Sequence, residues 1–172
     1  NHLDSHLISE KEIHELGIPV EIWSILNASI NLSRRFAYRN ADAIIKVIDR
    51  DQAATVQAHP YSLTHGIAEI IANALAYSPD NAEVVISQWQ ADHSVWISIL
   101  DTGAGIAPDQ IDYAMREFEQ IDREKWEQQG LGLGLPLANR IIEAHGGDLK
   151  LSSIVGKGTQ VVIRLPSLEG TF

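Results

Sequence analysis

An aspartate followed by glycines is the clearest candidate for ligand chemistry in this sequence. Asp101 opens the run Asp101-Thr102-Gly103-Ala104-Gly105, directly after an apolar stretch from His93 to Leu100 that predicts a buried strand. A carboxylate where a strand ends is a hydrogen-bond acceptor, and Gly103 and Gly105 let a flat ligand such as a purine approach the main chain closely. A strand-ending turn closed by the aspartate side chain would use the same residues. The motif alone leaves both interpretations open.

A second glycine-rich segment leads into a predicted helix. It reads Gly130-Leu131-Gly132-Leu133-Gly134-Leu135, and the helix runs from Pro136 to His145, with Gly146 ending it. Such a loop offers unpaired N–H groups and the positive end of the helix dipole, which suit phosphate. It lacks the Gly-Lys-Ser/Thr of a Walker loop, and no helix follows the first glycine motif as a dinucleotide fold requires. A hydrophobic turn with structural glycines is possible, but two such loops and an aspartate favour a nucleotide.

Polar side chains also recur at helical spacing along a predicted helix from Ser62 to Tyr77. His65, Glu69 and Asn73 fall at i, i+4 and i+8, opposite the apolar face of the helix. The amide oxygen of Asn73 suits Mg²⁺, which takes its further oxygens from water and phosphate. Glu69 is placed to orient or deprotonate a nucleophile near a terminal phosphate. A solvated helix face is the ordinary alternative for this pattern. The apolar face consists of Ile67, Ile70, Ile71, Ala74 and Leu75.

Composition limits the class of protein. The chain has 172 residues, a formal charge of -10 and no cysteine. This length suits one well-packed domain, and the negative charge argues against general nucleic-acid binding. Without cysteine, disulfides and thiolate metal sites are excluded. The sequence has no run of about 18 apolar residues, so no membrane contact is expected of it. The chain begins at Asn1 without methionine, and we expect a fragment of a larger protein or a processed chain.

The other elements complete an expected α+β fold. We expect residues 1–19 to be a linker or the end of a preceding helix, 20–168 to be one domain and 169–172 to be a tail. His14 begins a weak likeness to a phosphoacceptor box, but Gly17 and Ile18 break it, so we interpret it as a linker histidine. Apolar periodicity predicts a helix from Val20 to Ala37. The predicted strands are Ala43–Ile48 and Ala53–Ala58, joined by a polar turn, then Glu83–Trp89 and a hairpin of Asp148–Ser153 with Thr159–Leu165.

Together, the motifs resemble the GHKL ATPases, and within them the catalytic and ATP-binding domain of a bacterial sensor histidine kinase. Their order and spacing is far more specific than any one of them. The resemblance covers roughly Val20 to Pro166 and implies a Bergerat-type two-layer α/β sandwich, with a mixed sheet, helices on one face and an ATP lid. The matching motifs are Glu69-Ile70-Ile71-Ala72-Asn73-Ala74 (N box), Asp101 to Gly105 (G1 box), Phe118-Glu119-Gln120-Ile121-Asp122-Arg123 (F box), Gly130 to Leu135 (G2 box) and Gly156-Lys157-Gly158-Thr159.

The resemblance implies a role for each motif. Asp101 would accept the adenine amino group, with Thr159 reaching the same base directly or through water, while Gly103 and Gly105 lie against the base. Asn73 would hold Mg²⁺ between the phosphates, and Tyr77 would pack beside the ligand or close the helix end. Residues 116–130 would form the lid. The phosphates would be wrapped by the loop Gly130, Leu131, Gly132, Leu133, Gly134 and Leu135, and the terminal phosphate could be reached by Arg123.

Two positions depart from the usual sensor-kinase pattern. Glu69 stands where an asparagine is frequent, which leaves ATP hydrolysis open. Ala76 stands where a lysine or arginine is frequent, so one phosphate-side contact is missing and affinity or turnover could be lower. A serine kinase of the anti-sigma-factor type and a non-catalytic ATP sensor are therefore the alternatives.

We expect an ATP- and Mg²⁺-dependent transfer of the terminal phosphoryl group to a histidine on a separate domain. The expected partners are a dimerisation and phosphoacceptor domain and the receiver domain of a response regulator. We expect this segment to be monomeric and cytoplasmic, and it could be the cytoplasmic part of a membrane-bound receptor.

Overall fold

The computed structural model of the chain describes residues 9–37, 40–49, 54–80, 82–110, 112 and 134–168. Its centre is a five-stranded sheet with the strand order β2-β4-β5-β7-β6. β2 runs parallel to β4, and the other neighbouring pairs are antiparallel. The mixed sheet predicted from the sequence is therefore confirmed. Its strands are β2 (Ile44–Asp49), β4 (Glu83–Ala91), β5 (Ser94–Asp101), β6 (Asp148–Ile154) and β7 (Gly158–Pro166).

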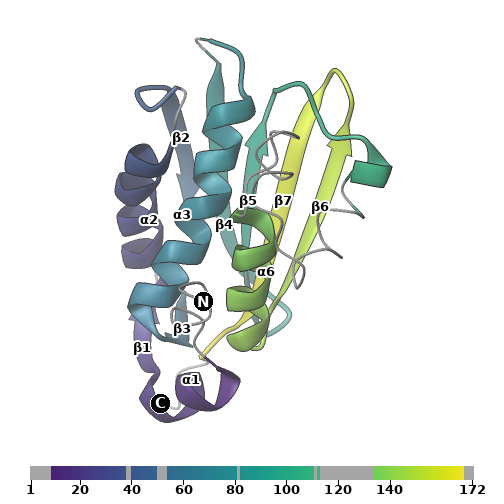
Figure 1. Cartoon of the computed structure of the whole chain (residues 1–172). Helices are drawn as coiled ribbons and strands as arrows, with labels where there is room; N and C mark the ends of the chain where they lie inside the picture. Colours follow the sequence, from purple (N-terminus) through teal and green to yellow (C-terminus); the bar gives the residue numbers. More distant parts are fainter. Residues whose placement is uncertain are drawn as a thin grey trace.

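Helices α2 (Ile22–Phe36), α3 (Pro60–Tyr77) and α6 (Gly134–Ala144) cover one face of this sheet (Figure 1). Alternate residues of the central strands point beneath them, because successive side chains of a strand face opposite ways. Ile86 and Ile97 are fully buried there. The structure is therefore a two-layer α/β sandwich with its core between the layers, as predicted.

Helix α3 lies at the centre of the helical layer and packs against both α2 and α6. It begins two residues earlier than predicted, because Pro60 fits the first turn and the side chain of His59 caps it. The Nδ1 atom of His59 accepts the backbone N–H of Ser62. The face of α3 that was predicted to be apolar is buried, with Ile67, Ile71 and Leu75 fully covered. The opposite, polar face is thereby left to form a site.

The sequence predicts a linker or the end of a preceding helix at residues 1–19, and the described part of this segment contains a short helix and the start of a strand. Residues Glu10–Leu16 form helix α1 and Ile18–Glu21 form strand β1, so the expected boundary at residue 20 falls inside a strand. Ser9 caps α1 with a capping box, and Ile13 is buried against the rest of the fold. The helix predicted from Val20 begins at Ile22 for the same reason, since Val20 is paired in β1.

The two strands predicted on either side of residues 49–52 do form, but they do not pair with each other. β3 (Thr55–Ala58) pairs antiparallel with β1 in a separate two-stranded sheet, while β2 joins the edge of the main sheet. The sequence pattern identified both strands but not their partners. Strand β1 itself was not predicted, because it is only four residues long, contains a proline and is mostly exposed. Among the described residues, the helices are too short or too polar to cross a bilayer.

Candidate nucleotide-binding site

Asp101 is the last residue of β5, and its side chain is 5% exposed. Its Oδ1 atom accepts the backbone N–H of Gly103 at 2.8 Å and that of Thr159 at 3.3 Å. The first contact is the aspartate turn that the sequence left open, and the second joins the turn to β7, where Thr159 lies directly opposite Asp101. Burial raises the pKa of Asp101 above its ordinary value, and the two N–H contacts offset this only in part. A buried acceptor with a costly charge is typical of a functional carboxylate.

Two glycines let the loop after Asp101 lie directly against the turn between β6 and β7. A Cβ atom at Gly158 would lie 2.1 Å from the carbonyl oxygen of Asp101, and one at Gly105 would lie 2.3 Å from the carbonyl oxygen of Ile154. Both glycines have positive φ angles, which other residues rarely adopt. The N–H of Gly156 also donates to the carbonyl of Ala104 at 2.7 Å. The first glycine motif and the last one thus form a single joined structure.

Ser153 completes this junction and was not identified from the sequence. It lies opposite Thr159 in the β6–β7 ladder, and its Oγ atom is 2.8 Å from the Oγ1 atom of Thr159. The same Oγ accepts the N–H of Ile106 at 2.7 Å and donates to the carbonyl of Gly158 at 3.0 Å. The only signal in the sequence was a serine directly across a hairpin from a candidate site residue.

Helix α3 brings one of its polar residues, Asn73, to the same region. Asn73 lines a cleft together with Asp101 and Thr159, and its buried Nδ2 atom has no hydrogen-bond partner among the described residues. One turn earlier, Glu69 lies 3.5 Å from the Nε2 atom of His65, which packs against the ring of Phe36. Glu69 and His65 are thus in contact along one face of the helix. The side chains of both are part-exposed rather than fully solvated, at 25% and 31%.

The cleft shared by Asn73, Asp101 and Thr159 lies between α3, α6 and the sheet, and Glu69 and His65 are not among its lining residues. Apolar side chains form its walls, including Ile70 of α3, Ile106 and Leu135, the second residue of α6. Its volume is about 20 Å³, which is room for about one water molecule. The cleft combines apolar walls with an acceptor and an uncommitted amide, which is the composition of a ligand site.

Some predicted site residues lie outside the described residues. They are the lid at 116–130 and Arg123, Gly130, Leu131, Gly132 and Leu133. Helix α6 begins at Gly134, two residues before the predicted start at Pro136, so Gly134 and Leu135 belong to the helix and not to the loop. Tyr77 is the last residue of α3, and only its backbone is described. Ala76 is buried, at 4% exposed.

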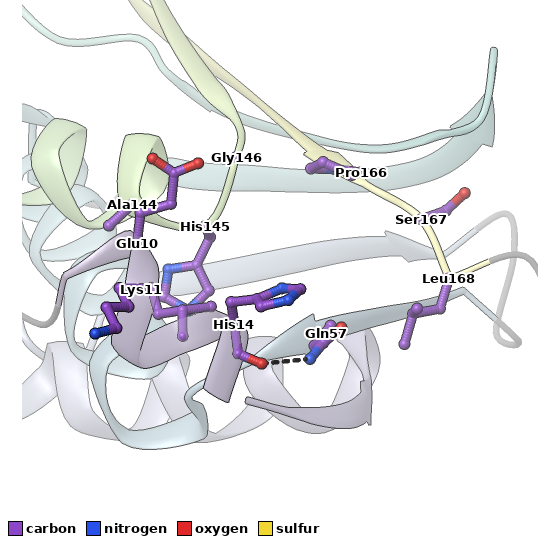
Figure 2. A pocket seen from close by; sticks show the side chains of 11 residues that line it. Glu10, Lys11, His14, Gln57, Ala144, His145, Gly146, Pro166, Ser167 and Leu168 are labelled. Carbon is purple, nitrogen blue, oxygen red and sulfur yellow. Dashed lines mark hydrogen bonds between the residues drawn. The ribbon is translucent and has the colours of Figure 1, made fainter. Parts of the chain in front are cut away.

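A larger cavity lies at the other end of α6. It measures about 570 Å³ and is lined by α1, Gln57, the end of α6 and the end of β7 (Figure 2). His145 forms part of its wall with both ring nitrogens engaged: Nδ1 donates to the carbonyl of Ile141 at 2.7 Å, and Nε2 accepts the N–H of His59 at 3.2 Å. Burial lowers the pKa of His145, which fits this neutral form. None of the predicted site residues lines this cavity, so size alone does not make it the nucleotide site.

Comparison with known proteins agrees with the geometry. The family described as "Histidine kinase-, DNA gyrase B-, and HSP90-like ATPase" matches residues 58–169. The chain belongs to this family. The resemblance inferred from the sequence motifs is therefore confirmed. Within the family, the chain is a catalytic ATP-binding domain of the sensor histidine kinase type.

Curated relatives give the comparison its detail. Histidine protein kinase DivJ of Caulobacter vibrioides is 33% identical over 113 residues, which is 66% of this chain and 19% of DivJ. Sensor histidine kinase WalK of Bacillus subtilis is 33% identical over 134 residues, 76% of this chain and 22% of WalK. The chain thus spans about a fifth of the length of these relatives.

Solved structures show the same fold. The mycobacterial sensor histidine kinase MprB has a TM-score of 0.72 at 23% identity, covering 90% of this chain and 99% of that one. Full-length ShkA, solved in complex with AMPPNP, has a TM-score of 0.70 at 23% identity, covering 90% of this chain and 32% of ShkA. These matches confirm the predicted fold class.

Proposed function

We propose that this domain binds ATP with Mg²⁺ and donates the γ-phosphoryl group to a histidine of a separate acceptor domain. The observation that carries the proposal is the convergence of Asp101, Thr159 and Asn73 on one cleft, in a chain whose relatives are named histidine kinases. These residues come from β5, β7 and α3, which are far apart in the sequence. A chance grouping of turn residues would not place a buried carboxylate and an uncommitted amide in the same cleft.

The adenine would lie against the loop of Gly103 and Gly105, with its amino group donating to Asp101 and to Thr159. The two N–H groups on Asp101 both reach Oδ1, so hydrogen-bonding capacity is left at Oδ2. The N-terminus of α6 at Gly134 would suit the negative charge of the phosphates, because its unpaired N–H groups and helix dipole favour anions. Within the proposal, the backbone of Gly130, Gly132 and Gly134 wraps the phosphates. Leu131 and Leu133 belong to the loop, Leu135 belongs to the first turn of α6, and Tyr77 and Arg123 complete the site.

Asn73 fits the requirement for a magnesium ligand. Its amide has a buried nitrogen without a partner among the described residues, so the side chain can turn its oxygen to a ligand without breaking a hydrogen bond. Within the described residues, no three His, Asp or Glu side chains form a metal cluster. One amide ligand with water and phosphate oxygens is the coordination that Mg²⁺ commonly accepts. Bound there, the ion would neutralise charge on the phosphates.

The transfer itself needs positioning more than covalent chemistry from the domain. A ring nitrogen of the acceptor histidine attacks the γ-phosphorus, the bond from that phosphorus to the bridging oxygen breaks, and ADP leaves with the electron pair. Glu69 lies one turn before Asn73 on α3, where its carboxylate can orient the acceptor or take its proton. His65 holds that carboxylate by the 3.5 Å contact.

The proposal also covers partners and location. The acceptor histidine lies on a dimerisation and phosphoacceptor domain, from which a response regulator receiver domain takes the phosphoryl group. We place the domain in the cytoplasm, where ATP is available, and expect this segment to be monomeric. Sedimentation that shows a stable dimer would contradict the last expectation.

The test is a phosphotransfer assay with γ-labelled ATP, Mg²⁺ and separately purified acceptor domains. Label on histidine is acid-labile and alkali-stable, and it should depend on Asp101 and Asn73. Alkali-labile label on a serine of a partner would favour the anti-sigma-factor type instead. Tight nucleotide binding without transfer to any acceptor would favour an ATP sensor, in keeping with Ala76 in place of a basic residue. A matched control is Ser152→Ala, which changes an exposed residue on β6.

A further inference from the structure

We propose that Ser153 is a positioning residue that fixes the Thr159 hydroxyl as an acceptor, and that this makes the base cleft selective for a 6-amino purine over a 6-oxo purine. The inference rests on the proposed nucleotide-binding function and concerns how the same cleft chooses its base. Ser153 itself is not among the residues that line the cleft, so it acts through Thr159.

The argument begins with the hydrogen-bond capacity of Ser153. A serine hydroxyl has one proton to donate and two lone pairs that accept. Its Oγ has three neighbours at hydrogen-bond distance: the N–H of Ile106, which can only donate, the carbonyl of Gly158, which can only accept, and the Thr159 hydroxyl, which can do either. All three contacts are satisfied together only if Ser153 donates to Gly158 and accepts from both Ile106 and Thr159.

This arrangement fixes the direction of the Thr159 hydroxyl. Its only proton points at Ser153 over 2.8 Å, so the Oγ1 atom has nothing left to donate and presents lone pairs. The reverse arrangement, in which Ser153 donates to Thr159, would leave the carbonyl of Gly158 without the proton that reaches it at 3.0 Å. The first arrangement makes all three hydrogen bonds, whereas the reverse arrangement loses one of them, so the first is favoured.

The neighbouring acceptor is Asp101, which lies directly opposite Thr159 in the β5–β7 ladder. Both residues line the cleft, and an ionised carboxylate also accepts only. The polar wall formed by these two side chains therefore offers acceptors side by side. A 6-amino group supplies two N–H donors and matches this wall, whereas the 6-oxo group of guanine would set an acceptor against acceptors.

Removing the Ser153 hydroxyl would release the Thr159 proton. In Ser153→Ala, the hydroxyl of Thr159 can rotate and donate into the cleft, so the wall no longer demands two donors from the base. The expected effect is a loss of discrimination and not only a loss of affinity. Ser152→Ala is the matched control, because the neighbouring residue lies on the exposed side of the same strand.

The experiment is titration calorimetry of the chain with three nucleotides: ADP, GDP and purine riboside diphosphate, which lacks the 6-amino group. The wild type should bind ADP about tenfold or more tightly than either of the others, since two buried acceptors lose their donors. Ser153→Ala should shrink the ratio of ADP to purine riboside diphosphate by about threefold or more. Ser152→Ala should leave the ratio unchanged.

Equal weakening of all three nucleotides by Ser153→Ala would overturn the proposal, because it would mean that the serine merely supports the fold. An unchanged ratio with unchanged affinities would overturn it as well. If the alanine variant is unfolded by circular dichroism, Thr159→Val tests the same point, since removing the second acceptor should also shrink the ratio, and an unchanged ratio there counts against the proposal. If the wild type binds none of the three nucleotides, the proposed function itself is refuted. That outcome differs from a failure of the Ser153 proposal, in which the wild type binds nucleotide but Ser153→Ala does not change the ratio.

Discussion

Replacing Asp101 by asparagine should separate ligand binding from folding stability. The side chain keeps its size, and its amide oxygen can still accept the N–H groups of Gly103 and Thr159, which reach Oδ1 in the structure. The second carboxylate oxygen becomes an NH₂ group, which only donates. A base amino group would then meet a donor where it had met an acceptor.

The expected loss of affinity follows from the bond that is removed. A hydrogen bond to a charged group contributes about 1.5–3 kcal/mol, which corresponds to about 10- to 150-fold in Kd. We therefore expect Asp101→Asn to weaken ADP by at least about tenfold. Purine riboside diphosphate lacks the amino group and should be weakened much less, which makes it the internal control.

In contrast to its nucleotide affinity, the folding stability of the unliganded Asp101→Asn domain should not fall at pH 7. Burial raises the pKa of Asp101, so the folded state holds a proton more tightly than the unfolded state does. The contribution of Asp101 to stability is therefore greatest at low pH and is lost as the pH rises through the raised pKa. At pH 7 the charged side chain is a cost, and Asp101→Asn should be as stable as the wild type or more stable.

Titration calorimetry tests the expected loss of ADP affinity, and urea unfolding at pH 7 and pH 4 tests the expected effect on folding stability. The stability difference between the variant and the wild type should shrink at the lower pH, because protonation of the wild-type carboxyl removes its buried charge. An Asp101→Asn domain that binds ADP as tightly as the wild type would refute the assignment of the base. A variant that is clearly less stable at pH 7 would refute the reasoning about the buried charge.

Three further predictions concern neighbouring features. Asn73→Ala should abolish the strengthening of nucleotide binding by Mg²⁺ and leave Mg²⁺-free ADP binding unchanged in calorimetry; a retained Mg²⁺ effect would exclude Asn73 as the ligand. Gly158→Ala should lower the free energy of unfolding in urea by more than about 1 kcal/mol, and by more than Gly156→Ala does. Both glycines have positive φ angles, but only a Cβ atom at Gly158 would collide with the backbone. Equal losses of stability in the two variants would contradict this reasoning. Burial lowers the pKa of His145, so the stability that the neutral ring contributes is full above about pH 6.5 and declines as the pH falls below that value. In His145→Ala, the loss of folding stability on acidification should be smaller. A variant whose stability depends on pH as the wild type's does would contradict the reasoning.

The fold could be predicted where the sequence repeats a clear period. The apolar face of α3 and the strands β5 and β7 are long and regular, so their place in the core followed from pattern alone. Strand β1 could not be predicted in this way, because most of its residues are exposed and its only described partner, β3, is also short. A strand of this kind is defined by its partner and not by its own sequence.

The residues of the candidate site also differ in whether the sequence alone could identify them. Asp101, Asn73 and Thr159 each belong to a motif with a recognisable type and spacing, and the structure brings them to one cleft. Ser153 has no such motif, since serine is common in strands and its role depends on which residue lies across the hairpin. Residues of a binding motif can be recognised by their spacing in the sequence. A residue that orients one of them from a neighbouring strand can be recognised only once the strand register is known.

The register of the sheet therefore does more than hold the core together. Asp101 faces Thr159 across one ladder, and Thr159 faces Ser153 across the next, so three polar residues lie in one row across β5, β7 and β6. A shift of one residue in either ladder would turn a member of this row to the opposite face of the sheet. The glycines at 105 and 158 permit the close approach of loop and turn that the row requires. In the proposed site, the same contacts that end the sheet at this point would therefore also determine which hydrogen bonds a base must supply.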